Sequence, residues 1–286
     1  MATLFDVLNT LRAGVATFRT LTPQHITPDM IHVGNNAVVC RCRVAGTECA
    51  LKCYPRKHRN LRAIYGDALY ENELAVYSLI GRVEYVDVVS TPWIEGDTLD
   101  RLFGDPKTDY RALSLRFESF ALDTLPGERA HGDIKPENIV VLPNGDMRLI
   151  DFDSAWLPGF VQSDMEEAGT PTFCHPSRAS RCFDKHIDDF SIALIVTMLA
   201  ALSYRRATFE PYIDADSSLF SPRAVVAGTD EMLNKALSLF ERKADARHYA
   251  IAHALYNCDG TIPNLIDLLE GDSSSVPALG LHQVLL

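Results

Sequence analysis

Three side chains that could support metal-dependent phosphoryl transfer lie close together within residues 131–153. Asp133 could orient an attacking hydroxyl group and accept its proton, and Asn138 and Asp151 could hold the Mg²⁺ ions that neutralise the transferring phosphate. Each residue alone is unremarkable, since Asp and Asn are common in turns and helix caps. Their combination on two short segments favours a site for chemistry on a phosphate.

The sequence between these side chains predicts a β-hairpin. Ile139–Leu142 and Met147–Ile150 read as two short strands, and Pro143-Asn144-Gly145 is a good turn between them. A hairpin would return Asp151 to the side on which the two preceding candidates lie.

The spacing of Asp133, Lys135 and Asn138, followed by a hairpin and Asp151-Phe152, resembles the catalytic and metal-binding loops of the eukaryotic-type protein kinases. The resemblance covers roughly residues 30–255 of the chain. It implies an α+β, bilobal fold with a small antiparallel-sheet lobe that includes one helix and a mainly helical large lobe. It also implies ATP as the phosphate donor, Mg²⁺ bound by Asn138 and Asp151, and a protein Ser or Thr hydroxyl as the acceptor.

The same resemblance divides the chain into three segments. Residues 1–94 would form an N-terminal helix and the small lobe, residues 95–270 the large lobe, and residues 271–286 a mobile tail, with the nucleotide in the cleft between the lobes. The N-terminal helix, which would pack on the small lobe or on a partner, is predicted from apolar residues at helical spacing, namely Leu4, Leu8, Leu11, Val15 and Phe18.

A lysine at the end of a predicted strand, Lys52 in Cys49–Lys52, matches the kinase lysine that contacts the inner phosphates of the nucleotide. That role requires a carboxylate from a helix. The segment Ala63–Ile80 has a helical pattern and contains Glu71 and Glu73; Glu73 fits the family better, and Glu71 is the alternative. A solvated charge pair on the surface is the simpler interpretation of the same residues.

Further nucleotide contacts are implied by the resemblance. The segment His32–Val39 occupies the place of the glycine-rich loop but keeps only Gly34 of three glycines, which predicts a stiffer loop and weaker binding. The segment Val88–Gly96 resembles the hinge, where the adenine would contact the backbone of Pro92 and Ile94. The implied nucleotide-binding residues are Gly34, Val39, Ala50, Lys52, Glu73, Pro92, Ile94, Asn138 and Asp151.

The segment Gly169–Ser177 resembles the part of a kinase that seats the substrate. Thr170 would hydrogen-bond with Asp133 and Lys135, and the combination of Lys135 with Thr170 is typical of the serine/threonine-directed branch. With Lys52, these three residues form the implied catalytic set.

Asp188 precedes a continuous apolar run, Phe190–Leu202. The run is shorter than the roughly 20 residues that a bilayer span needs, so it predicts a buried core helix and no membrane span. It resembles the central helix of the kinase large lobe, with Asp188 bracing the catalytic loop.

The chain departs from the family at three positions. Gly132 replaces an arginine that binds a phosphate on the activation segment, so we expect activity that does not depend on that phosphate. Asp153 replaces a glycine and would add a carboxylate near the metals. Ser177 replaces a glutamate whose partner would be Arg247, so Arg247 is expected beside another carboxylate or in solvent.

Composition limits the classes of partner and the compartment. The 38 acidic residues exceed the 27 basic residues and give a formal net charge of −11, which argues against general binding to nucleic acid or anionic membranes. The seven cysteines show no C-x-x-C spacing, so free thiols in a reducing cytoplasm are expected. A cross-strand disulfide among Cys40, Cys42, Cys49 and Cys53 stays geometrically conceivable, and no feature indicates an oligomeric state.

The sequence therefore predicts an ATP- and Mg²⁺-dependent serine/threonine protein kinase. One alternative is a small-molecule phosphotransferase of the aminoglycoside or choline kinase type, which often carries His-Gly-Asp; Lys135–Asn138 and Gly169–Pro171 argue against it. The other is a pseudokinase that binds or scaffolds, which Asp153, Ser177 and the depleted glycine loop support and the complete catalytic set opposes.

Overall fold

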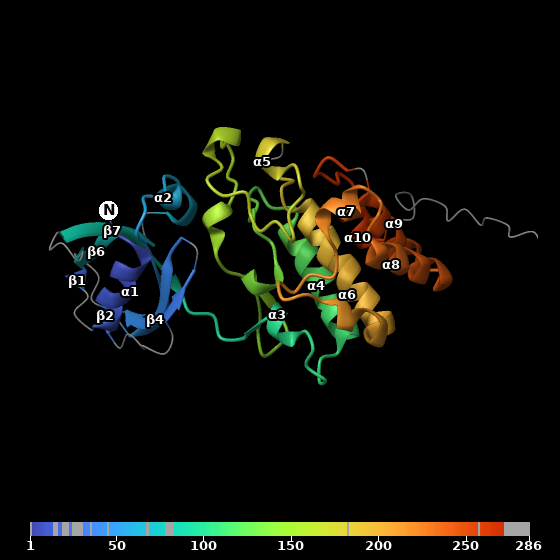
Figure 1. Ribbon diagram of the computed structural model, residues 1–286, viewed down its shortest axis with the longest axis horizontal. Coiled ribbons are helices and arrows are strands. Elements are labelled where there is room, and N and C mark those ends of the chain that lie inside the picture. The colour runs from blue at the N-terminus through green and yellow to red at the C-terminus, as the bar shows by residue number, and fades with distance from the viewer. Residues whose placement is uncertain are drawn as a thin grey trace, which may run out of the picture. The chain divides into compact units, whose positions relative to one another are not determined.

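The chain divides into two compact units, Met1–Ile94 and Glu95–Leu286 (Figure 1). The first is built on an antiparallel sheet and the second is mainly helical, so the predicted α+β class is confirmed. The computed structural model describes residues 2–13, 17–18, 23–24, 31–34, 36–44, 46–66, 69–77, 83–181, 183–256 and 258–271. Of the predicted mobile tail, all residues after Gly271 lie outside this part of the chain.

The first unit contains a seven-stranded sheet in the order β1-β6-β7-β5-β4-β2, with β3 beside β4. Its strands are β1 Thr17–Phe18, β2 Pro23–Gln24, β3 Ile31–Val33, β4 Val38–Val44, β5 Thr47–Tyr54, β6 Tyr70–Tyr77 and β7 Val83–Pro92. Along β4 and β5 buried and half-buried residues alternate, so one face forms a core and the other carries Val39, Ala50 and Lys52.

The N-terminal helix α1 (Leu4–Arg12) covers the core face of this sheet. A capping box between Thr3 and Asp6 begins the helix, and Val7 and Leu11 are buried in the same cluster as the strands. The predicted packing on the small lobe is confirmed. The predicted pattern extended too far, however, because the helix ends at Arg12 and Phe18 lies in β1, while Val15 lies outside the described residues.

Four cysteine side chains lie on the buried face, namely Cys40, Cys42, Cys49 and Cys53. All are free thiols, although Cys42 and Cys49 are directly opposite each other on β4 and β5. Burial raises the pKa of Cys40 and of Cys42 to about 12. The cysteines therefore act here as small apolar core residues, as expected for free thiols.

The helix predicted over residues 63–80 is wrong where the structure describes this segment; residues 67–68 and 78–80 lie outside the described residues. The structure has one helical turn, α2 (Leu61–Tyr65), which ends at Gly66 with a φ of 78°, and then the strand β6. The neighbouring apolar strand β7 pairs with β6 along its length apart from one β-bulge, and this pairing outweighs the local helical pattern. Glu71 and Glu73 therefore lie on a strand, Glu73 at a β-bulge, and not on a helix beside Lys52.

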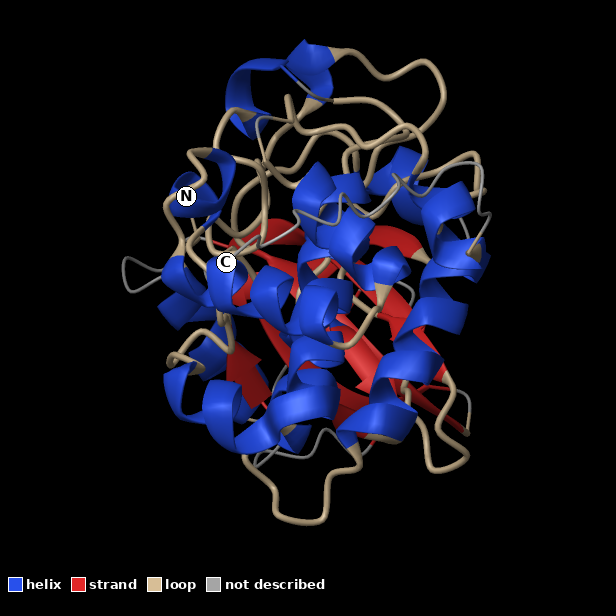
Figure 2. Ribbon diagram, turned by 90° about the vertical axis from the view of Figure 1, so that its right-hand side faces the viewer, coloured by secondary structure: helices blue, strands red, loops and turns tan. Residues whose placement is uncertain are grey.

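The second unit is mainly helical (Figure 2), and α6 lies at its centre. Its helices are α3 Leu99–Leu102, α4 Tyr110–Thr124, α5 Arg178–Arg181, α6 Asp189–Phe209, α7 Pro222–Val226, α8 Glu231–Arg242, α9 Ala246–Ala254 and α10 Leu265–Glu270. A small sheet contains β8 Asp97–Thr98, β9 Ile139–Val141 and β10 Met147–Leu149, and single 3₁₀ turns are η2 Pro136–Asn138, η3 Phe152–Ser154, η4 Gln162–Asp164 and η5 Glu210–Tyr212.

The helix α6 is the centre of this core and packs against α4, α8 and α9. Every residue from Asp189 to Leu202 is buried, which confirms the predicted core helix. By length and composition alone the stretch Asp189–Tyr212 could cross a membrane, but 67% of its apolar window is buried inside the unit. The central helix of a globular domain shows the same combination.

A buried polar network joins α4 to α9. The guanidinium of Arg247 lies 2.6 Å from the carboxylate of Glu118. Arg247 therefore has a carboxylate partner, as expected from the serine at position 177 where the kinase pattern has a glutamate. His248 bridges Glu118 at 3.0 Å and Asp245 at 2.6 Å. Such a network stabilises a fold only when its charges are mutually satisfied.

The charges in this network shift the pKa values of its members. Burial alone would lower the pKa of His248, but hydrogen bonds and charges from Asp245 and Glu118 raise it. Burial alone would raise the pKa of Asp245, but the hydrogen bonds and the charge of His248 lower it to about 2. The folded state therefore favours an imidazolium between two carboxylates.

This arrangement predicts a pH-dependent stability. Because the pKa of His248 is raised in the folded state, its stabilisation is complete below the ordinary histidine pKa of about 6.5 and is lost as pH rises through the folded value. We expect His248→Gln to lower the free energy of unfolding by about 2 kcal/mol at pH 6 and by less at pH 8.5. Urea unfolding across this range measures the difference, with His253→Gln on the exposed face of α9 as the control. A deficit that does not change with pH would contradict the assignment.

Candidate active site

The predicted hairpin is present and positions the two candidate metal ligands. β9 and β10 pair antiparallel, with Ile139 opposite Leu149, and η2 leads directly into β9. The N–H of Ile150 donates to the carbonyl of Asn138 at 3.0 Å. Since Asp151 follows Ile150, this bond places Asp151 beside Asn138.

A second bond fixes the start of the same loop. His131 Nε2 donates to the carbonyl of Ile150 at 2.8 Å, and His131 Nδ1 accepts from the N–H of Asp133 at 3.2 Å. The imidazole therefore connects the residue before Asp151 with the residue proposed to carry the chemistry. The ring of Phe152 packs edge-on against that of His131, with centroids 4.7 Å apart.

The carboxylate of Asp133 is held at three points. Oδ1 accepts from the N–H of Thr170 at 2.6 Å, and Oδ2 accepts from Asn138 Nδ2 at 3.0 Å and lies 3.2 Å from Lys135 Nζ. A carboxylate offers about four lone-pair positions, so a position on Oδ1 stays open for a hydroxyl group. The group is oriented and still able to accept a hydrogen bond.

Lys135 and Thr170 are in contact, as the sequence suggested. Lys135 Nζ donates to Thr170 Oγ1 at 2.8 Å and is half-buried. The ammonium group lies beside Oδ2 of Asp133, from where it could offset negative charge on a transferred group. The structure brings together Asp133, Lys135, Asn138 and Thr170 in one hydrogen-bonded cluster.

Asp188 holds the loop at His131 and Gly132 through its side-chain carboxylate, as the sequence predicted. Its carboxylate is 3% exposed and accepts from the N–H groups of His131 at 2.5 Å and Gly132 at 2.9 Å. Arg178, which the sequence analysis missed, is also buried and donates to the carbonyls of Gly132, at 2.7 Å, and Ile187. Only its position directly after the substrate-seating segment could have pointed to this role.

Steric constraints explain the glycine at position 132. Its φ is 79°, and a Cβ built there would lie 2.0 Å from the carbonyl oxygen of Ser154. Gly169 is similar, with a φ of 77° and a Cβ position 2.6 Å from the carbonyl oxygen of Gly132. No side chain fits at either position without moving the backbone, so the arginine of the protein kinase pattern could not be accommodated here.

Asp151 has the left-handed backbone conformation, with φ 68° and ψ 65°. This conformation is strained for a residue other than glycine, by about 1–3 kcal/mol, and such residues cluster at functional sites. Asp151 is exposed, whereas Asp153 is buried. The extra carboxylate of Asp153 is therefore not presented to solvent beside Asp151.

The candidate metal ligands are compatible with Mg²⁺ held jointly with phosphates. Asn138 uses its amide nitrogen for Asp133, which leaves its amide oxygen for a cation, and Asp151 presents an exposed carboxylate. Within the described ranges no group of three or more His, Cys, Asp or Glu side chains is arranged to hold a metal alone. Mg²⁺ commonly takes one or two protein ligands and completes its shell with phosphate and water.

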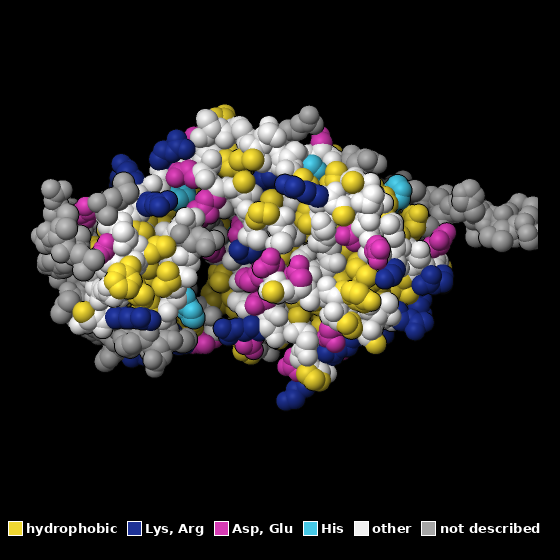
Figure 3. Space-filling view, viewed as in Figure 1, with side chains coloured by type: hydrophobic (Ala, Val, Ile, Leu, Met, Phe, Trp, Pro, Cys, Tyr) yellow, Lys and Arg dark blue, Asp and Glu magenta, His cyan; other side chains and the backbone are white. Residues whose placement is uncertain are grey.

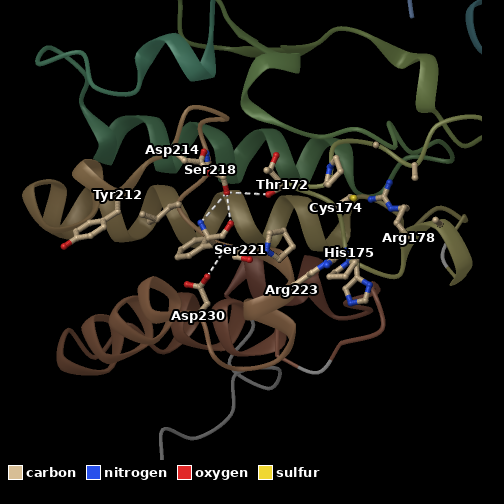
Figure 4. A pocket seen from close by; sticks show the side chains of 18 residues that line it. Thr172, Cys174, His175, Arg178, Tyr212, Asp214, Ser218, Ser221, Arg223 and Asp230 are labelled. Atoms are coloured by element: carbon tan, nitrogen blue, oxygen red, sulfur yellow. Dashed lines mark hydrogen bonds between the residues drawn. The ribbon is translucent and has the colours of Figure 1, made fainter. Parts of the chain in front are cut away.

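A pocket of about 690 Å³ lies beside the segment that carries Thr170 (Figure 4). The segment Gly169–Arg178 forms one wall, and residues from Tyr212 to Arg223 form another. The two walls are connected where Ser218 Oγ approaches the carbonyl of Thr172 at 3.5 Å. The pocket is lined by Gly169 and Pro171, the two neighbours of Thr170, which bonds to Asp133. It therefore lies along the segment that the sequence assigned to substrate binding.

The remaining predicted nucleotide contacts lie in the first unit. Lys52 is half-buried on β5, opposite Val39 on β4, and its Nζ is 5.5 Å from the centroid of the Tyr54 ring. Ala50 lies opposite Thr91 on β7.

The predicted loop and hinge residues flank these strands. The N–H of Gly34 donates to the carbonyl of Ala37 at 2.9 Å, and β4 begins at the next residue, Val38. Pro92 ends β7, opposite Cys49, and Ile94 follows it.

Comparison with models of known protein families and with curated proteins found no match.

The bracing by Asp188 generates a prediction. In Asp188→Asn one oxygen is replaced by an NH₂ group that cannot accept, so one of two buried N–H groups loses its partner. We expect the free energy of unfolding to fall by about 2 kcal/mol and amide exchange at His131 and Gly132 to accelerate. Hydrogen exchange measures this, with Asp123→Asn on the exposed side of α4 as the control. Unchanged exchange at both amides would show that the loop does not depend on Asp188.

Proposed function

We propose that the chain is a protein kinase that uses ATP and Mg²⁺ to phosphorylate serine or threonine hydroxyls. One observation carries the proposal: the Asp133 carboxylate is held by Thr170, Asn138 and Lys135 while one lone-pair position stays open. General bases for hydroxyl groups need this combination of fixed orientation and a free acceptor position. The α+β architecture, with a sheet unit followed by a helical unit, is compatible with the kinase-like fold.

Each residue of the cluster has a role in this proposal. Asp133 orients the acceptor hydroxyl and accepts its proton, and Lys135, itself held by Thr170, offsets charge on the transferred phosphoryl group. Asn138 and Asp151 would hold the metal, which when bound neutralises negative charge on the donor phosphates. Lys52 is assigned to the inner phosphates by the family resemblance.

The proposal does not include the expected helical carboxylate for Lys52. The helix α2 (Leu61–Tyr65) contains no acidic residue, and Glu73 belongs to β6. A lysine orders phosphates as a point charge, so this function does not require a fixed geometry of the kind that arginine imposes. We therefore expect Lys52 to contribute to nucleotide affinity without the helix-borne pair.

The pocket beside Gly169–Arg178 favours a protein acceptor. Its volume of about 690 Å³ can take side chains that flank an acceptor residue, and its walls include both apolar and charged groups. Gly132, by contrast, fits the His-Gly-Asp sequence of small-molecule phosphotransferases, so that class is the second candidate. A screen of protein and metabolite acceptors with labelled ATP separates the two.

The role of Asp133 predicts a specific kinetic defect. Asp133→Asn keeps the size of the side chain but removes the base, so we expect turnover to fall by about 10²–10⁴-fold while ATP affinity changes little. Transfer from γ-³³P-labelled ATP measures turnover, and thermal shift with ATP and Mg²⁺ measures binding. Asp146→Asn, exposed at the hairpin turn, serves as the control. Undiminished transfer by Asp133→Asn would remove the assignment, and binding without transfer by the unaltered protein would favour the pseudokinase.

Gly132 predicts independence from activation-segment phosphorylation. Position 132 carries no cation and has no room for one, so a phosphate on residues 152–177 would have no reader at this point. We expect exhaustive phosphatase treatment to leave the rate of transfer to a substrate within about twofold of the untreated protein. Loss of transfer after treatment, restored by rephosphorylation, would overturn this prediction.

A further inference from the structure

A groove between the end of α6 and the face of α8 is lined by cations. Its volume is about 460 Å³, and its charged residues are Arg205, Lys235 and Arg242. No acidic residue of the described chain lines it. Figure 3 shows Lys and Arg side chains gathered over the ends of these two helices. The groove is thus locally positive on a chain whose formal net charge is −11.

These cations have no carboxylate partner within the described residues. Within the described residues, the side chains of Arg205 and Arg242 make no ion pair or hydrogen bond, and Lys235 faces only the ring of Tyr212, 5.3 Å from its centroid. The adjacent Arg206 differs, since it lies 2.7 Å from Glu210. The three cations line one groove without a counter-ion there, and because like charges repel one another, a bound anion would be favoured.

The helix geometry directs these groups to one place. On α8, Lys235, Ser238 and Arg242 are spaced i, i+3 and i+7, which places them on one side of the helix. Arg205 interrupts α6 with a non-helical φ of −147° and ψ of 59°. The acidic residues of α8, Glu231 and Glu241, do not line the groove.

Neutral donors and a firm base complete the groove. Thr208, Ser238 and Asn234 bring hydroxyl and amide groups to its wall. Phe209 and Leu239, which are 1% and 3% exposed, form its apolar base. Two guanidinium groups can each bind phosphate oxygens in a bidentate manner, an ammonium adds a point charge, and hydroxyl groups satisfy the remaining oxygens.

We propose that this groove, lined by Arg205, Lys235 and Arg242, binds a phosphate monoester. Three positive charges suit a dianion, and a volume of about 460 Å³ leaves room for the group that carries the phosphate. A long polyanion such as nucleic acid fits less well, because it would extend from this patch onto a surface that is acidic in total. The inference is independent of the proposed kinase activity, since the groove contains none of the residues assigned to it.

The test is binding by the full-length chain. Isothermal titration with a phosphoserine peptide, free O-phosphoserine and glucose 6-phosphate is compared with the unphosphorylated peptide, its glutamate analogue and single-stranded DNA. We expect the phosphorylated ligands to bind and Arg205→Gln/Arg242→Gln to weaken that binding at least tenfold. Lys243→Gln, which removes a charge at the same helix end but outside the groove, should leave it unchanged. A circular dichroism melt checks that each variant is folded.

The arms of this experiment have distinct meanings. Tighter binding of the phosphopeptide supports a phosphorylated protein as the source of the ester, and equal binding of the free esters supports a small phosphorylated molecule. The proposal is overturned if the unaltered protein binds no ester, if the double variant binds as well as the unaltered protein, or if DNA or the glutamate peptide binds equally tightly. Competition by an ATP analogue would likewise overturn it, because the ester would then occupy the nucleotide site.

Discussion

The candidate active site depends on one buried carboxylate. Asp188 accepts hydrogen bonds from the N–H groups of His131 and Gly132, and it is fixed in turn by its position at the start of α6. A buried charge of this kind is stable only if donors satisfy it, and buried N–H groups need an acceptor. The loop and the core helix therefore stabilise each other, and the orientation of Asp133 follows from this mutual requirement.

Steric constraints connect this anchor with the departures from the kinase pattern. The left-handed backbone of Gly132 brings the loop against Ser154, and Gly169 approaches the same point from the segment that carries Thr170. Where the protein kinase pattern has an arginine, this loop has a glycine and close backbone packing. Arg178 donates to the carbonyl of Gly132 and contributes a buried positive charge near Asp133. The glycine at position 132, which departs from the kinase pattern, also allows the backbone at Gly132 to lie against that of Ser154.

The sequence predicted those parts of the fold that local residues determine. The hairpin between Asn138 and Asp151 was predictable from its turn residues. The helix α6 was predictable because a continuous apolar run of this length indicates a buried core helix. The segment 63–80 could not be predicted in this way, because pairing with β7 decided its conformation. Arg178 was missed for the same reason: its partners, the carbonyls of Gly132 and Ile187, are set by tertiary packing.

The central claim is that Asn138 and Asp151 form one binding site for a metal that carries the donor phosphates. The most direct measurement is a crystal structure of the protein with Mn²⁺ and a non-hydrolysable ATP analogue, in which anomalous scattering locates the metal. The account predicts a metal about 2.1 Å from both Asn138 Oδ1 and an Asp151 carboxylate oxygen, with phosphate oxygens completing its shell. A bound nucleotide whose metal contacts neither residue would contradict it.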